Sequence, residues 1–129
     1  MAHRSRLAGF IIDCRTDDLG GAADFWGGAL GLDVTDPDEG GAGRYACLSE
    51  GPGGLHIEVQ RVEHESRVHL DIETDDIEAE VARLKTLGAS EVSRPYNRRW
   101  VVMQAPTGQR FCVVRLQPGH EKKTFNEWP

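Results

Sequence analysis

The sequence lacks several features that would assign it at once to a functional class. Its three cysteines are an odd number without close spacing, which is typical of reduced thiols in a cytoplasm rather than of a disulfide scaffold. Basic residues are outnumbered, with 15 Lys and Arg against 21 Asp and Glu, and the formal charge of −6 disfavours nucleic acid or an anionic membrane as partner. No apolar run approaches the roughly 18–20 residues that span a bilayer. We therefore expect a cytoplasmic protein that binds neither nucleic acid nor membrane.

Familiar catalytic motifs are also absent. The sequence shows no recognisable Ser-His-Asp or Cys-His catalytic arrangement, and no glycine run has the spacing of a phosphate-binding loop. The length of 129 residues, with 39% hydrophobic and 28% charged residues, suits one folded domain with a core of its own. Any functional assignment must therefore come from the internal organisation of the chain.

What the chain does contain is an internal repeat. Segment 12–19 resembles segment 70–77, 58 positions later, and each copy leads into a helical pattern that ends on Leu-Gly. A second match, at 54 positions, relates 52–59 to 106–113. A repeat of this kind predicts one domain built from two similar halves.

Each half is predicted to contain one helix among several strands. Strands are expected at 7–14, 44–49, 55–61, 67–73, 100–104 and 110–116, and helices at 17–30 and 75–87. The composition of Asp36–Gly43 predicts a turn or loop. A capping-box-like pair, Asp75 and Glu78, is expected to begin the second helix.

Alternation along 67–73 predicts which way each side chain points. Every second residue from Val68 to Ile72 is apolar, and this face, which includes Leu70, is expected to pack on the helix that follows. His69, Asp71 and Glu73 are then expected to look onto solvent or a cleft.

Three segments carry a family resemblance: Phe25–Trp26 to Leu30–Gly31, His69–Leu70 to Leu87–Gly88, and 105–112. They resemble the glyoxalase / bleomycin-resistance / extradiol-dioxygenase superfamily, also called the vicinal oxygen chelate fold, and within it small bacterial glyoxalase-like domains. The resemblance covers residues 7–117. It implies an α+β fold of two βαβββ modules, about 7–61 and 67–116, whose curved mixed sheets enclose a groove with helices on the outer faces. A C-terminal tail, 118–129, follows.

The resemblance also implies four positions for metal ligands. Metal-dependent members place His or Glu on four equivalent strands, which correspond here to Ile11, Glu58, His69 and Cys112. Ile11 cannot ligate, and Cys112 is interpreted as a small buried hydrophobe. We therefore expect no metal and no cofactor. The alternative is a divalent metal such as zinc held by Glu58, His69 and Cys112.

Polar side chains from both halves are expected to line the groove. Asp13 and Asp71 occupy equivalent positions, either as duplicated structural residues or as an acid–base pair. Arg110 is expected to receive an anionic ligand or to form a salt bridge with a groove carboxylate. The full set of candidate ligand-binding residues is Asp13, His56, Glu58, His69, Asp71, Trp100, Arg110 and Cys112.

Three functions remain open at this point. The favoured one is a small-molecule-binding protein without a complete metal site. The second is a lyase, isomerase or dioxygenase of the same superfamily, either metal-dependent or using a groove carboxylate as base, with no catalytic residue assigned. The third is an assembly protein with a vestigial groove, in which Phe125 and Trp128 of the tail contact the domain or the second subunit of a homodimer.

Overall fold

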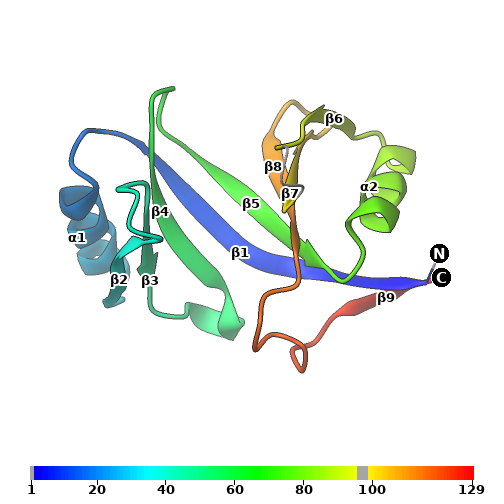
Figure 1. Cartoon of the computed structure of the whole chain (residues 1–129), viewed down its shortest axis with the longest axis horizontal. Coiled ribbons are helices and arrows are strands. Elements are labelled where there is room, and N and C mark those ends of the chain that lie inside the picture. The colour runs from blue at the N-terminus through cyan, green and yellow to red at the C-terminus, as the bar shows by residue number, and fades with distance from the viewer. Residues whose placement is uncertain (1, 96–98) are drawn as a thin grey trace. The chain divides into compact units, whose positions relative to one another are not determined.

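A computed structural model describes residues 2–95 and 99–129 of the chain (Figure 1). The chain divides into two compact units. The first unit is Gly9–His69, and the second unit combines residues 1–8 with Leu70–Pro129. The long strand β1, His3–Arg15, contributes its first residues to the second unit and its remaining residues to the first.

The first unit is a mixed four-stranded sheet with one helix. After β1 come α1 (Leu19–Leu30), β2 (Val34–Glu39), β3 (Tyr45–Leu48) and β4 (His56–Val62), with a short 3-10 turn at Pro52–Gly54. The strand order is β2–β3–β4–β1. β4 runs parallel to β1, whereas the β2–β3 and β3–β4 pairs are antiparallel.

The second unit repeats this plan. It contains β5 (Arg67–Thr74, whose first three residues belong to the first unit), α2 (Ile77–Thr86), β6 (Ser90–Ser93), β7 (Trp100–Gln104), β8 (Arg110–Arg115) and β9 (Asn126–Trp128). β5 and β8 are parallel, and β7 pairs antiparallel with both β8 and β6. β9 pairs antiparallel with residues 3–5 of β1. Two βαβββ repeats with mixed sheets confirm the expected α+β fold class.

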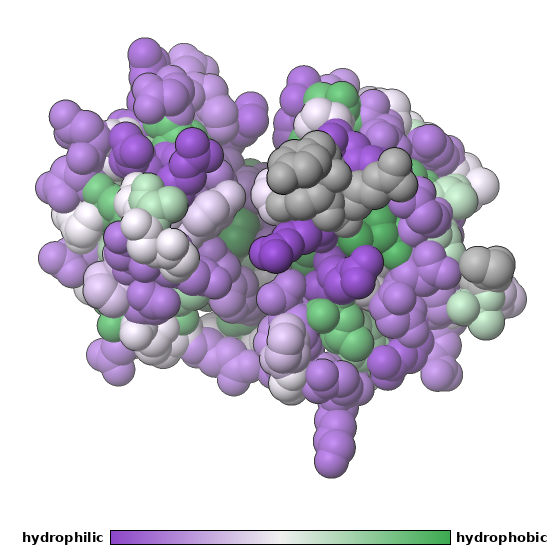
Figure 2. All heavy atoms as spheres, in the orientation of Figure 1, coloured by the Kyte–Doolittle hydropathy of each residue, from purple (hydrophilic) through white to green (hydrophobic). Residues whose placement is uncertain are grey.

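Each unit has a hydrophobic core between its helix and one face of its sheet. In the first unit α1 covers β2, β3 and β4, and the buried residues of this core are Ile12, Leu48, Ile57 and Val59. In the second unit α2 covers β6, β7 and β8, and the buried residues are Val81, Leu84, Val101, Met103 and Val113. Hydrophilic side chains dominate the surface seen in Figure 2, as expected when apolar residues are drawn into two cores.

The helices begin at aspartate caps. Asp18 accepts a hydrogen bond from Gly21 N at the start of α1, and Asp76 accepts one from Ala79 N at the start of α2. The expected capping role of Asp75 is therefore wrong by one residue, because the Asp75 carboxylate instead accepts a hydrogen bond from the backbone N–H of Arg4, at 2.8 Å.

Two other local predictions are wrong. Residues 36–39 of the expected loop belong to β2, where pairing with β3 overrides the turn-forming composition. Val68 and Leu70 are exposed rather than packed on α2, because only Ile72 at the end of that face reaches the core. On the opposite face of β5, Glu73 is fully buried.

Within the described residues, no helix is both long and apolar enough to cross a membrane.

Candidate functional site

The sheet of the first unit has a polar face on the side opposite α1. Ile57 and Val59 of β4 point into the core, so strand alternation directs their neighbours to the other side. The register aligns Cys47 of β3 with Glu58, and Ile11 of β1 with the same glutamate. We call this surface the polar face; its hydrophilic members are Asp13, Tyr45, Cys47, His56, Glu58 and Gln60.

A glycine allows β1 to approach β4 beside this face. Gly9 is the register partner of His56. A Cβ added at Gly9 would lie 1.7 Å from the backbone oxygen of His56, far inside van der Waals contact. Only a residue without a side chain fits there, so the local position of His56 depends on Gly9.

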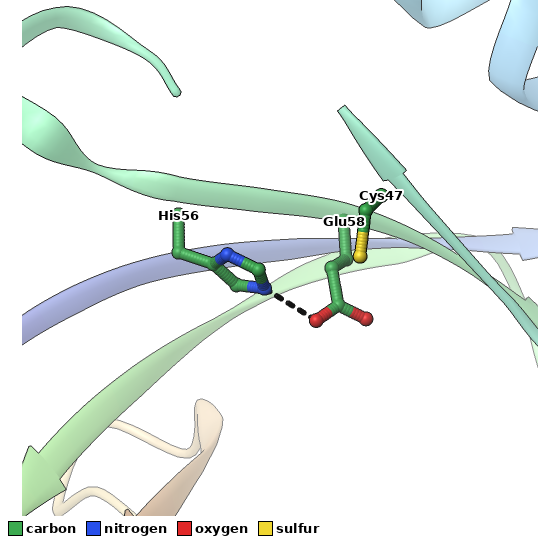
Figure 3. Close-up of side chains that lie close together, drawn as sticks. All are labelled: Cys47, His56 and Glu58. Atoms are coloured by element: carbon green, nitrogen blue, oxygen red, sulfur yellow. Dashed lines mark hydrogen bonds and ion pairs between the residues drawn. The ribbon is translucent and has the colours of Figure 1, made fainter. Parts of the chain in front are cut away.

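Cys47, His56 and Glu58 converge on the polar face, and we call them the polar trio (Figure 3). One potential ligand atom from each lies within 4.8 Å of the other two. Nε2 of His56 is hydrogen-bonded to Oε1 of Glu58. The Cys47 thiol donates to Oε2 of Glu39, at the end of β2, over 2.8 Å. Potential sulfur, nitrogen and oxygen ligands for a metal therefore lie close together on the β3–β4 strand pair.

The surroundings of Cys47 favour its protonated, neutral thiol. Burial raises the pKa of Cys47, and the hydrogen bond to Glu39 and the charge of Glu58 raise it further. Burial likewise raises the pKa of Glu39, with the Cys47 thiol opposing the shift and Glu58 adding to it. The cause in both cases is a concentration of acidic groups in a partly desolvated place.

Asp13 and His69 form a second polar contact in the first unit. Oδ2 of Asp13 lies 2.7 Å from Nδ1 of His69, and the Asp13 side chain is only 2% exposed. Nε of Arg67 lies 3.9 Å from the same oxygen. The other carboxylate oxygen, Oδ1, is buried without a hydrogen-bond partner among the described residues. A buried carboxylate that orients an imidazole is an arrangement suited to acid–base chemistry.

The remaining expected site residues lie in the second unit. Asp71 and Cys112 are register partners on β5 and β8, so the structure brings these two together. Trp100 is half-buried on β7, opposite Val114. Nε of the exposed Arg110 donates to Oε1 of Gln104 at 3.0 Å, rather than to a carboxylate.

The four family-equivalent metal positions do not all offer a donor. Ile11 is 4% exposed and carries only carbon in its side chain, directly beside Glu58 in the register. A metal centre that needs a ligand from the first strand is therefore not matched by this chain.

Sequence reasoning missed two residues of the site. The sequence indicates Cys47 only as a reduced thiol and places Glu39 in a turn or loop. The alternation of Tyr45 and Cys47 in the expected strand 44–49 places the thiol on the face of Glu58 once this strand is paired with the next one, 55–61. No local signal indicated that residue 39 would lie beside them.

Residues 9–114 match the family model described as Glyoxalase-like domain. No curated protein matches the chain.

Solved structures with the same fold include proteins of several kinds. A hypothetical protein from Bacillus halodurans is similar with a TM-score of 0.61 and 17% identity, over 92% of this chain and 99% of that one. A variant of methylmalonyl-CoA epimerase from Streptomyces coelicolor, in complex with 2-nitronate-propionyl-CoA, gives 0.59 and 20% identity over 88% and 95%. The Mn(II)-bound glyoxalase from Novosphingobium aromaticivorans gives 0.58 and 17% over 89% and 40%. At these identities the likeness concerns the fold alone.

Proposed function

Because this chain belongs to the glyoxalase-like domain family, we propose that it binds a small molecule on its polar face and does so without the metal centre of the metal-dependent members. The observation that supports the lack of this metal centre is the identity of residue 11, an isoleucine. Of the four family-equivalent metal positions, the one on the first strand carries only carbon, so the four-ligand centre cannot be completed.

The chemistry of the polar face favours a ligand that donates hydrogen bonds or carries positive charge. Glu58 contributes a partly exposed carboxylate, and the buried Asp13 carboxylate adds negative charge. Tyr45 and Gln60 add a hydroxyl and an amide, joined by a 3.0 Å hydrogen bond. An organic cation with N–H groups matches this surface better than an anion. The three cysteines are free, which supports a reducing compartment such as the cytoplasm.

Three matched probes test this function: benzamidine, benzamide and benzoate, which share one ring and differ in charge. In ¹H–¹⁵N NMR titrations at millimolar concentration, we expect benzamidine to shift backbone signals of β3 and β4, and benzoate to leave them unchanged. Glu58→Gln should weaken benzamidine binding about tenfold, or about 1.4 kcal/mol, through loss of a charge-assisted hydrogen bond. If no probe shifts any signal of the first unit, or if benzoate binds best, the proposed function is wrong.

One observation favours a second candidate function, a metal-free enzyme. His69 is held by buried Asp13, so its imidazole has the fixed orientation that a general base requires. The matching reaction class is removal of a proton from carbon next to a carbonyl. The probe is S-propionyl-N-acetylcysteamine in D₂O, with deuterium incorporation at the α-carbon followed by ¹H NMR. Exchange that is faster than in buffer and lost in His69→Ala supports the enzyme; exchange equal to buffer eliminates it for thioesters.

A further inference from the structure

We infer that the polar trio, Cys47, His56 and Glu58, is a zinc site. The site shares Glu58 with the family-equivalent metal positions, but its other two ligands, Cys47 and His56, lie outside them. The inference goes beyond the proposed ligand-binding function and does not depend on it.

The backbone places the trio on a firm platform. Cys47 and Glu58 are direct partners of the antiparallel β3–β4 pair, and His56 lies two residues before Glu58 on the same face. The turn that joins the strands is closed by a hydrogen bond from Gly51 N to Leu55 O at 2.9 Å. All three ligands therefore come from one hairpin, and none depends on an irregular loop.

The donor atoms lie near enough to one another for side-chain rotation to form a zinc centre. Zinc binds sulfur at about 2.3 Å and nitrogen or carboxylate oxygen at about 2.0–2.2 Å, so tetrahedral ligands lie about 3.5 Å from one another. The trio's donor atoms lie within 4.8 Å, and Figure 3 shows the His56 ring and the Glu58 carboxylate turned toward each other. A zinc ion would replace the His56–Glu58 hydrogen bond and draw Sγ of Cys47 inward by rotation of flexible side chains.

The donor set selects the metal. Calcium and magnesium prefer oxygen ligands, whereas a thiolate with imidazole and carboxylate suits zinc. Zinc binding removes the Cys47 proton, because the thiolate is the ligand. The new Zn–S bond forms as the S–H bond breaks, and the proton leaves to solvent past Glu39, which already accepts the hydrogen bond of the thiol.

The site keeps one position open. The side chains of His56 and Glu58 are 37% and 13% exposed, so solvent reaches the place where a fourth ligand would bind. Three protein ligands and one water or ligand position form the open type of zinc centre rather than the closed structural type. A metal here would present a Lewis acid on the polar face.

Metal analysis of variants tests the site. Protein stripped with chelator and then titrated with zinc should bind about one equivalent. Substitution of a group that only orients a ligand already weakens zinc sites about 10–100-fold, so loss of a ligand in Cys47→Ser or His56→Ala should raise the zinc Kd at least about 100-fold. Cys14→Ser and His64→Ala are matched controls from the same unit, and both should bind zinc as the wild type does. Far-UV circular dichroism of each apo variant confirms that it is folded.

Cobalt substitution identifies the sulfur that is bound. The wild type with Co²⁺ should give a sulfur-to-metal charge-transfer band, which is absent in Cys47→Ser and unchanged in Cys112→Ser. Calorimetric zinc titrations in two buffers of different ionisation enthalpy should detect the released proton. The inference fails if the band survives in Cys47→Ser, if it disappears in Cys112→Ser, or if no stoichiometric zinc binds. Benzamidine titrations of chelator-treated protein keep the proposed function separately testable.

Discussion

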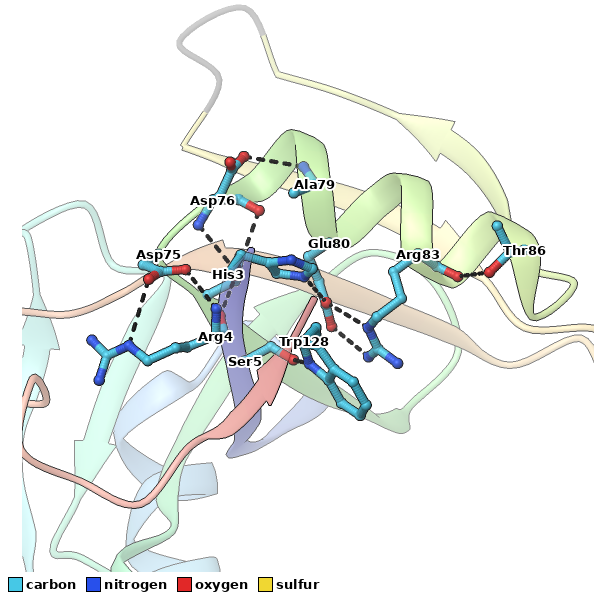
Figure 4. Close-up of polar contacts among 11 residues, drawn as sticks. His3, Arg4, Ser5, Asp75, Asp76, Ala79, Glu80, Arg83, Thr86 and Trp128 are labelled. Atoms are coloured by element: carbon cyan, nitrogen blue, oxygen red, sulfur yellow. Dashed lines mark hydrogen bonds and ion pairs between the residues drawn. The ribbon is translucent and has the colours of Figure 1, made fainter. Parts of the chain in front are cut away.

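His3 and Glu80 pair inside the second unit although 77 positions separate them in the sequence. Nε2 of His3 is 2.8 Å from Oε1 of Glu80, and both side chains are buried (Figure 4). Arg83 donates from Nε and Nη2 to the two oxygens of the same carboxylate, each at 2.8 Å. A single carboxylate therefore ties the first strand to α2.

We expect Glu80 to make stability depend on acid pH. Burial alone would raise the pKa of Glu80, but hydrogen bonds from Arg83, His3 and Ser5 together outweigh it and lower the pKa. An unfolded glutamate titrates near pH 4.3, so between that pH and the lower folded pKa the unfolded chain binds more protons. The stabilisation is complete above the unfolded pKa and is lost as pH falls through the folded one.

Glu80→Gln isolates this contribution. Because Arg83 and His3 would lose a buried charged partner, we expect the free energy of unfolding at pH 7 to fall by about 3–5 kcal/mol. Urea unfolding between pH 3 and 7 should show a weaker pH dependence for Glu80→Gln than for the wild type. Equal pH dependence of the two proteins would contradict the role given to this carboxylate.

We expect Trp128 to stabilise its own unit rather than to form a subunit interface. Its Nε1 donates to Oγ of Ser5 at 2.9 Å, and the Arg83 guanidinium lies 3.9 Å from its ring centroid. Trp128→Ala should cost about 1.5–3 kcal/mol of unfolding free energy, from one hydrogen bond and one cation–π contact, whereas Trp128→Phe should lose mainly the hydrogen bond, about 1 kcal/mol. Light scattering should give the same mass for all three proteins. A change in oligomeric state with unchanged stability would instead support the tail as a subunit interface.

We expect buried Glu73 to stabilise the protein through charged partners that the alternation of β5 does not predict. It was expected to face solvent or a cleft, yet it is fully buried, with Nε of Arg6 at 2.5 Å and Nδ1 of His120 at 3.0 Å. Glu73→Gln should destabilise the protein by about 3–5 kcal/mol because it leaves Arg6 buried without its counter-ion. The double variant Arg6→Met/Glu73→Leu should be less destabilised than Glu73→Gln in denaturant unfolding. If the double variant is the less stable of the two, the unpaired-charge explanation fails.

The repeat explains why so much of the fold could be predicted. It predicted two similar halves, the family resemblance implied their βαβββ order, and the apolar spacing predicted α1 and α2. The residues that could not be predicted depend on tertiary contacts. Residues 126–128 became β9 because they pair with residues 3–5, more than a hundred positions away. The site shows the same division. The pairing of Cys47 with Glu58 follows from the β3–β4 hairpin. Glu39, in contrast, reaches Cys47 through a register shift between β2 and β3 that no local pattern indicates.

Substitutions at two glycines should have opposite effects on stability, because Gly9 lies where β1 and β4 approach closely and Gly28 lies beside open space. Gly9→Ala would place a methyl group 1.7 Å from the backbone oxygen of His56, so a strand must move, and we expect a loss of about 1–3 kcal/mol. Gly28→Ala adds the same methyl group on α1 with nothing within 4 Å, and should gain about 0.5–1 kcal/mol through helix propensity. Urea unfolding measures both. Because His56 moves with β4, Gly9→Ala should also weaken zinc binding, whereas Gly28→Ala should not; equal zinc affinities would show that the strand spacing does not set the geometry of the trio.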